Sequence, residues 1–199
     1  MSLKRAVPIL IREAFAPWQR RVVKIDQLIC SRAPQHFVLG YGGRPIDNFP
    51  PRSFFAQELN RDATGVRAFE RWLMWRFIDG GEGRIPKAEG GMMTGSVVDA
   101  IRIAATEFGV EGSKLPHDLT TLDREVIRLG IALRVTQYFE VFKNIRVHGY
   151  DYRRGYAQCV QSNHGDLEII GGHHRLAMLR ALGCEETRVI VYPPHDPRA

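Results

Sequence analysis

The chain has 199 residues, of which 44% are hydrophobic and 25% are charged. This composition predicts one globular domain with an ordinary buried core, and no low-complexity segment or internal repeat interrupts it. The net charge of +6 and the pI near 9.5 allow an acidic partner such as a nucleotide or nucleic acid, but the charge alone favours the plainer interpretation, a slightly basic bacterial-type cytosolic protein.

The cysteines argue against a disulfide scaffold or a zinc ribbon. Cys30, Cys159 and Cys184 are odd in number and form no CxxC pair. A reducing, cytoplasmic location is therefore expected. The apolar run at residues 6–11 is followed by a charged pair at residues 12–13, so it is too short for a secretion signal or a membrane span, and no membrane partner is expected.

The first fifty residues predict a short helix, a strand and a loop. Residues 9–18 have the pattern of a short amphipathic helix, and residues 22–29 alternate like a strand in their first half. Residues 30–53 are rich in proline and glycine and predict a loop. Within this loop GYGGRP (residues 40–45) carries Arg44, a candidate substrate-binding residue, although a plain turn explains the same letters.

Residues 64–78 predict a helix with an aromatic stripe. Its apolar residues recur at helical spacing, with arginines between them: Phe69, Trp72, Leu73 and Phe77. Aromatic rings beside arginines can stack on bases in a nucleic-acid groove. A stripe of this kind more often faces the core, with the arginines on the solvated side, and we favour that interpretation.

Residues 79–95 predict a long glycine-rich loop. Gly90 and Gly95 have the spacing of a Walker A motif, but Ser96 and Val97 follow where the motif requires lysine, so a P-loop is rejected. Long loops in compact domains often form lids or binding loops. Glu89 is the best candidate for a functional carboxylate in this loop. The competing interpretation, which is the default, is that Glu89 is simply a solvent-exposed acid.

Two helices are predicted next. The first is capped by Thr94 or Ser96 and ends at Gly109, and its apolar face comprises Ile101, Ala104, Ala105 and Phe108. The second begins at a Thr120–Asp123 capping box and ends at residues 148–149. Gly130 leaves open whether this long pattern, which runs to Ile145, is one helix or two.

The last forty residues predict strand, turn, strand, glycine turn, helix and strand. Residues 156–161 and 167–170 form the two strands around an Asn-His-Gly turn, and residues 188–192 form the last strand. Gly171 and Gly172 make a tight turn into a helix that opens with His173, His174 and Arg175. A glycine turn at a helix N-terminus directs backbone N–H groups and the positive end of the dipole toward one point, so this turn predicts a phosphate site.

The order of these elements resembles the ParB N-terminal/sulfiredoxin-like superfamily. The resemblance rests on FKNIRVHGY (residues 142–150), YAQCVQSNHGDLEII (156–170) and GGHHRLAMLRALG (171–183), with VVKIDQLI (22–29) as the first strand. It implies an α+β fold: a small mixed sheet with helices, and a mainly helical insertion at about residues 40–120. The core would then comprise residues 20–30 and 120–192 of a single domain spanning 1–199.

The resemblance also implies that a nucleoside di- or triphosphate, ATP/ADP or CTP, with or without Mg²⁺, binds through its phosphates to Gly171, Gly172, His173, His174 and Arg175. Arg175 would grip phosphate oxygens, and either histidine can donate hydrogen bonds or move a proton. The competing interpretation is a structural turn.

Departures from the family pattern narrow the expected activity. Sulfiredoxins carry a reactive cysteine where this chain has His173, which argues against sulfinate reduction. Partition ParB proteins read GERR and continue into a helix-turn-helix domain, whereas this chain reads GHHR and stops seven residues after Tyr192. The HHR version is most similar to amino-acid kinases of this fold, whose Asp before the GHHR glycine is replaced here by Gly171.

Three functions remain open. The first, slightly favoured, is an ATP/ADP-dependent phosphotransferase or NTPase acting on a small polar substrate, with its carboxylate supplied by Glu89, Asp151 or Glu168. The second is a DNA-binding or nuclease-like protein that lines a nucleic-acid backbone with the arginines of residues 64–78. The third is a non-catalytic nucleotide sensor. Ligand-induced stabilisation without turnover would separate the first from the third.

Overall fold

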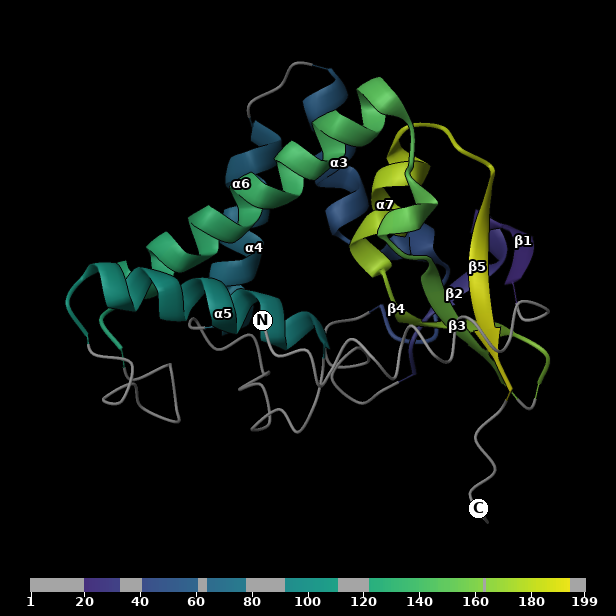
Figure 1. The fold of residues 1–199 in the computed structure, drawn as a ribbon, viewed down its shortest axis with the longest axis horizontal. Coiled ribbons are helices and arrows are strands. Elements are labelled where there is room, and N and C mark those ends of the chain that lie inside the picture. The colour runs from purple at the N-terminus through teal and green to yellow at the C-terminus, as the bar shows by residue number, and fades with distance from the viewer. Residues whose placement is uncertain are drawn as a thin grey trace, which may run out of the picture.

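The computed structural model describes residues 20–32, 41–60, 64–77, 92–110, 122–162 and 164–193. These residues form a mixed α+β fold with a five-stranded sheet and five α-helices (Figure 1). The predicted fold class is therefore correct at the level of α+β with a small mixed sheet. The predicted helix at 9–18 and Glu89 lie outside the described residues.

The sheet has the strand order β1-β5-β3-β4-β2 and mixes parallel and antiparallel pairs. β5 pairs antiparallel with β1 and parallel with β3, while β4 pairs antiparallel with β3 and parallel with β2. The strands span Arg20–Lys24 (β1), Leu28–Cys30 (β2), Ala157–Gln161 (β3), Leu167–Gly171 (β4) and Glu186–Tyr192 (β5).

The helices gather on one side of this sheet. α7 lies between the sheet and the other helices, and α5 lies along α6 at the far end (Figure 1). The helices span Pro51–Leu59 (α3), Thr64–Phe77 (α4), Met92–Glu107 (α5), Arg124–His148 (α6) and His173–Ala181 (α7), with 3-10 turns at Ile25–Gln27 (η2), Ile46–Asn48 (η3) and Tyr152–Arg154 (η6).

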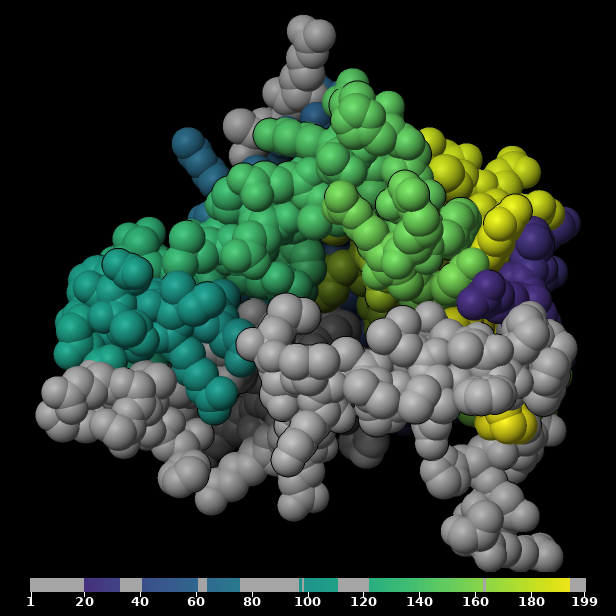
Figure 2. Space-filling view, viewed as in Figure 1, coloured from purple at the N-terminus to yellow at the C-terminus, as the bar shows by residue number. Residues whose placement is uncertain are grey.

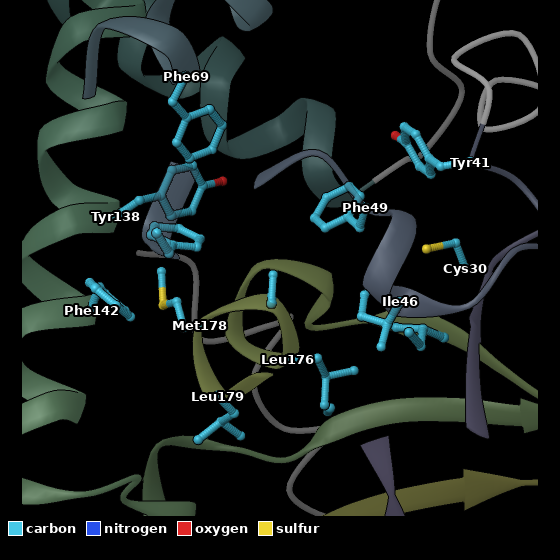
Figure 3. Close-up of a cluster of buried hydrophobic side chains, with 14 of the residues drawn as sticks. Cys30, Tyr41, Ile46, Phe49, Phe69, Tyr138, Phe142, Leu176, Met178 and Leu179 are labelled. Atoms are coloured by element: carbon cyan, nitrogen blue, oxygen red, sulfur yellow. The ribbon is translucent and has the colours of Figure 1, made fainter. Parts of the chain in front are cut away.

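One hydrophobic cluster joins the sheet to α3, α4, α6 and α7. Phe55, Phe69 and Phe142 are fully buried and stack with one another or with neighbouring rings. Figure 3 shows Phe69 next to Tyr138, with Phe49 between this pair and Tyr41. Burying so many large rings contributes much of the folding free energy, because each removes on the order of 150–250 Å² from water.

The aromatic stripe of the predicted helix at 64–78 belongs to this core. Phe69 and Leu73 are buried, and Trp72 packs against the cluster, while Arg71 is exposed. The favoured interpretation of this helix is thus confirmed. The alternative, in which its aromatic rings line a nucleic-acid groove, does not fit rings that already fill the protein interior.

Several local predictions near the N-terminus were wrong. Residues 22–29 do not form one strand, because η2 separates β1 from β2 with Ile25 buried at the bend. The loop predicted at 30–53 contains η3 and the start of α3, which begins at Pro51. Proline is well placed at the first position of a helix, so the Pro50-Pro51 pair marked a helix start that its loop-like composition concealed.

The predictions for α5 were also partly wrong. The helix begins at Met92, so residues 92–95 of the predicted loop belong to it, and Thr94 and Ser96 lie inside it rather than at its start. Phe108 lies at its end and is 58% exposed, unlike Ile101 and Ala105, which are buried.

α6 is a single helix, which settles the question that Gly130 left open. Its N-cap is Asp123, whose side chain accepts a hydrogen bond from the Glu125 N–H. Gly130 serves the packing of α5 on α6, because a Cβ atom at this position would lie 2.4 Å from the Cα of Ile101. Leu133, part of the apolar pattern, is 44% exposed.

Candidate functional site

The glycine turn predicted to bind phosphate connects β4 to α7. Gly172 is the N-cap of α7 and has φ 87° and ψ 17°, a left-handed conformation that side chains disfavour. A Cβ atom at this position would also lie 3.1 Å from the Cα of Ala157 in β3. The turn therefore requires glycine for two reasons, its backbone conformation and its close approach to the neighbouring strand.

The first turn of α7 presents its backbone toward this loop. Gly172 itself has no side chain to cap the helix, and its carbonyl accepts a helical hydrogen bond from the Leu176 N–H. The N–H groups of a first helical turn point away from the helix, together with the positive end of its dipole. Anions are stabilised at such positions by about 0.3–1 kcal/mol at exposed sites.

Arg175 lies in this first turn, and hydrogen bonds from one of its guanidinium nitrogens hold the side chain in place. Nη1 donates hydrogen bonds to the Tyr150 hydroxyl at 2.8 Å and to the Gly155 carbonyl at 3.0 Å. The Tyr150 hydroxyl itself donates to the same carbonyl. Among the described residues, none accepts a hydrogen bond from Nε or Nη2, so this edge of the fork is available for a bidentate contact with an oxyanion.

The two histidines are built into the aromatic core. His174 is 8% exposed and stacks on Tyr138, with ring centroids 4.3 Å apart and an interplanar angle of 18°. His173 is 3% exposed, and its centroid lies 5.6 Å from that of Phe49. Rings in these positions act as packing elements, so what the first turn offers a ligand is its backbone and the Arg175 side chain. Catalytic roles for the imidazoles stay predictions.

Asp151 follows Tyr150 in the chain, and the Tyr150 hydroxyl accepts the hydrogen bond from Arg175. Its carboxylate caps η6 and accepts hydrogen bonds from the Arg153 backbone N–H at 3.0 Å and from Arg153 Nε at 2.9 Å. These hydrogen bonds hold the pKa of Asp151 below its ordinary value. The group is therefore ionised at neutral pH, which suits it for binding a cation better than for accepting a proton.

The other predicted residues lie along β2 and β4. Glu168 accepts hydrogen bonds from Arg32 Nη1 at 2.7 Å and from the Arg32 backbone N–H at 3.2 Å, and Asp166 pairs with the same guanidinium at 2.7 Å. Arg44 is exposed, and its carbonyl accepts a hydrogen bond from the Cys30 N–H at 2.8 Å. The structure thus gives Glu168 an ion-pairing role between β4 and the end of β2.

Sequence reasoning missed Tyr150 and Gly155, which hold Arg175. Tyr150 follows the helix-ending Gly149 directly, in the same HGY letters that carried the family resemblance, and this was the one available signal. The hydrogen bond joins residues 25 positions apart, which no local pattern encodes. Gly155 contributes its backbone carbonyl, so its side-chain type gives no sign of the contact.

The thiols supply no further chemistry at the turn. Burial raises the pKa of Cys30 and of Cys159 to about 12, so both remain protonated at neutral pH and are poor nucleophiles. No group of three or more His, Cys, Asp or Glu side chains within the described residues is arranged to hold a metal ion. The expected Mg²⁺ stays a prediction that would involve oxygens of the nucleotide itself.

No protein-family model, curated protein or solved structure matches this chain. In the part of the chain that the structure describes, none of the helices combines the length and apolar character needed to cross a membrane.

Proposed function

We propose that this protein binds a nucleoside di- or triphosphate at the Gly171–Arg175 turn, on a core of the ParB/sulfiredoxin-like type. The observation that supports this most is the orientation of Arg175. One nitrogen is held by Tyr150 and Gly155, and the Nε–Nη2 edge is left without an acceptor among the described residues, beside the N-terminus of a helix. A fixed guanidinium next to helical N–H groups suits a phosphate group.

The favoured activity is phosphoryl transfer or nucleotide hydrolysis on a small polar substrate. Such chemistry depends mainly on positioning and on stabilising charge at the transferred phosphoryl group, which Arg175 and the helix N-terminus would supply. Asp151, which is ionised and follows Tyr150 in the chain, would help to hold Mg²⁺ on the nucleotide. A purely sensory role would use the same turn without turnover.

Thermal unfolding with ATP, ADP, CTP and GTP, with and without Mg²⁺, tests the binding site. A nucleotide at about 100 times its dissociation constant should add about 2.7 kcal/mol to the free energy of unfolding. Arg175→Ala should abolish the increase. Because that variant also loses two structural hydrogen bonds, Tyr150→Phe is the matched control: it should lower the basal melting temperature but retain the nucleotide-induced shift.

The outcomes are distinct. If no nucleotide stabilises the wild type, the turn has a structural role only and the proposal fails. If Tyr150→Phe and Arg175→Ala lose the shift equally, the hydrogen-bonded scaffold matters rather than the free edge of the guanidinium. Phosphate release from the stabilising nucleotide then separates an enzyme from a sensor, and Asp151→Asn should slow that release without changing binding of the metal-free nucleotide.

A further inference from the structure

A second surface lies where β1, β5 and the segment before β3 meet. Its centre is a pair of tyrosine rings, Tyr152 and Tyr156, whose centroids are 5.4 Å apart. The guanidinium of Arg188 lies 5.5 Å from the centroid of Tyr152, and that of Arg20 lies 5.0 Å from that of Tyr156. We call these four residues the tyrosine–arginine face.

The register of the sheet explains why these side chains meet. Val22 of β1 is opposite Arg188 of β5, and Ala157 of β3 is opposite Val189, so Tyr156 is level with Arg188. Residues level with each other on paired strands share one side of a sheet. In Figure 2 the light green segment around residue 150 lies next to the purple of β1 on the visible surface.

The rings are held in place from behind. The Tyr152 hydroxyl lies 3.2 Å from Oγ1 of Thr187, which is 4% exposed, and it accepts a hydrogen bond from the Arg188 N–H at 3.3 Å. Tyr150 packs edge-on against Tyr152, with centroids 4.8 Å apart. Fixed rings lose little conformational entropy when a ligand stacks on them, so the face is preorganised for flat partners.

The charge on this face is positive. Arg20 and Arg188 are exposed, and no carboxylate of the described residues forms a salt bridge with either of them. Asp151 is paired with Arg153. Glu186 lies two positions before Arg188 on β5 and is opposite Lys24 of β1.

We propose that the tyrosine–arginine face binds single-stranded nucleic acid. Bases would stack on Tyr152 and Tyr156 or on the guanidinium planes above them, and the phosphates would contact Arg20 and Arg188. The tyrosine rings favour nucleic acid over an acidic peptide. An acidic peptide would contact only the arginines, whereas unpaired bases would stack on the rings while their phosphates contact the arginines. A duplex keeps its bases stacked on each other, so it cannot use the rings.

Fluorescence anisotropy with labelled single-stranded RNA and DNA of about twelve nucleotides tests the proposal, with a duplex of the same sequence beside them. The charge variant is Arg20→Gln with Arg188→Gln. Its matched control is Arg102→Gln with Arg128→Gln, which removes two arginines of α5 and α6 whose side chains are 57% and 53% exposed. Both double variants lose the same net charge.

We expect single strands to bind more tightly than the duplex, with affinity that falls as salt rises. Since each phosphate contact on a single strand contributes about 0.7 to the slope of log affinity against log salt, the face variant should reduce that slope by about 1.4 and the control should leave it unchanged. Tyr156→Leu should weaken binding about tenfold, while Tyr156→Phe, which retains the ring, should bind like the wild type.

Each of the following results would overturn the proposal: no binding of either single strand at low salt, equal affinity for the duplex, an equal effect of the two double variants, or wild-type binding by Tyr156→Leu. Polyglutamate is added as a competitor. If it displaces the strand at matched charge concentration, the face is a site for acidic proteins and the proposal also fails. Tight binding of either RNA or DNA supports it, and the stronger of the two identifies the preferred sugar.

Discussion

Replacing Gly172 with alanine should destabilise the protein more than the same change at two other glycines with a similar positive φ. Gly165 and Gly183 have φ values of 88° and 81°, close to the 87° of Gly172. An added Cβ atom meets nothing within 4 Å at either of these two positions, but at Gly172 it lies 3.1 Å and 3.2 Å from the Cα and Cβ of Ala157. The three variants therefore share a backbone cost and differ in one contact.

The magnitude follows from these two contributions. A left-handed conformation costs an L-residue about 1–2 kcal/mol, and the reduced entropy of the unfolded chain returns about 0.4–1 kcal/mol of this. Ala157 is 4% exposed in β3, a strand paired on both edges, so it cannot move aside easily. Crowding a packed site costs about 1–3 kcal/mol. We expect a loss of about 1 kcal/mol for Gly165→Ala and Gly183→Ala, and about 2–4 kcal/mol for Gly172→Ala.

Urea unfolding followed by circular dichroism measures these differences, since all three variants are compared at the same denaturant slope. Equal losses for Gly172→Ala and Gly165→Ala would refute the argument, because the contact with Ala157 would then have no energetic effect. A nucleotide that stabilises the wild type should also stabilise Gly165→Ala to the same extent. It should stabilise Gly172→Ala less, because a displaced turn would no longer aim its N–H groups at the phosphate.

Gly130→Ala should destabilise the protein although alanine favours helices, because the added Cβ would overlap the backbone of Ile101. Ile101→Ala leaves that backbone in place, so the double variant should not regain stability. Urea unfolding of both variants checks this. The hydrogen bonds from Arg180 lower the pKa of Asp47, so their stabilisation is present above the unfolded pKa and is lost as pH falls through the lower folded value. Asp47→Asn should therefore destabilise the protein at pH 7 and remove part of its acid sensitivity, measured as melting temperature from pH 7 to pH 2. Of the three cysteines, Cys184 should be alkylated first in the native state, since the other two are buried, and mass spectrometry after a short iodoacetamide pulse reports which thiol has reacted.

The glycine turn and its neighbours were predictable because their signals are local. A glycine pair between an apolar run and a helical pattern specifies a turn into α7. The strand signals for β3 and β4 are similarly local, since alternation on each side of a polar turn with glycine at Gly165 predicts a hairpin. These elements match their predicted bounds to within one or two residues.

The partners of the candidate site were not predictable, because contacts between distant segments decide them. His174 carries the chemistry of a catalytic residue in sequence, and only its ring contacts with Tyr138 and Phe69 show it as part of the core. Glu168 alternates as a solvent-facing residue would, yet Arg32 neutralises it from 136 positions away. A single sequence lists donors and acceptors but does not state which of them are already used.

The segment from Tyr150 to Tyr156 connects the two proposed sites, and this makes their tests interpretable. Tyr150 holds Arg175 on one side and packs against Tyr152 on the other, so a change that unfolds the segment would abolish both activities. A substitution outside the segment should separate the two activities. Arg175→Ala should abolish nucleotide binding and leave the binding of single-stranded nucleic acid unchanged. Conversely, Arg188→Gln should weaken the binding of single-stranded nucleic acid and leave nucleotide binding unchanged. Loss of both functions in Arg188→Gln, with the melting temperature unchanged, would mean that one ligand spans the two surfaces, with its phosphate at the turn and its bases on the tyrosines.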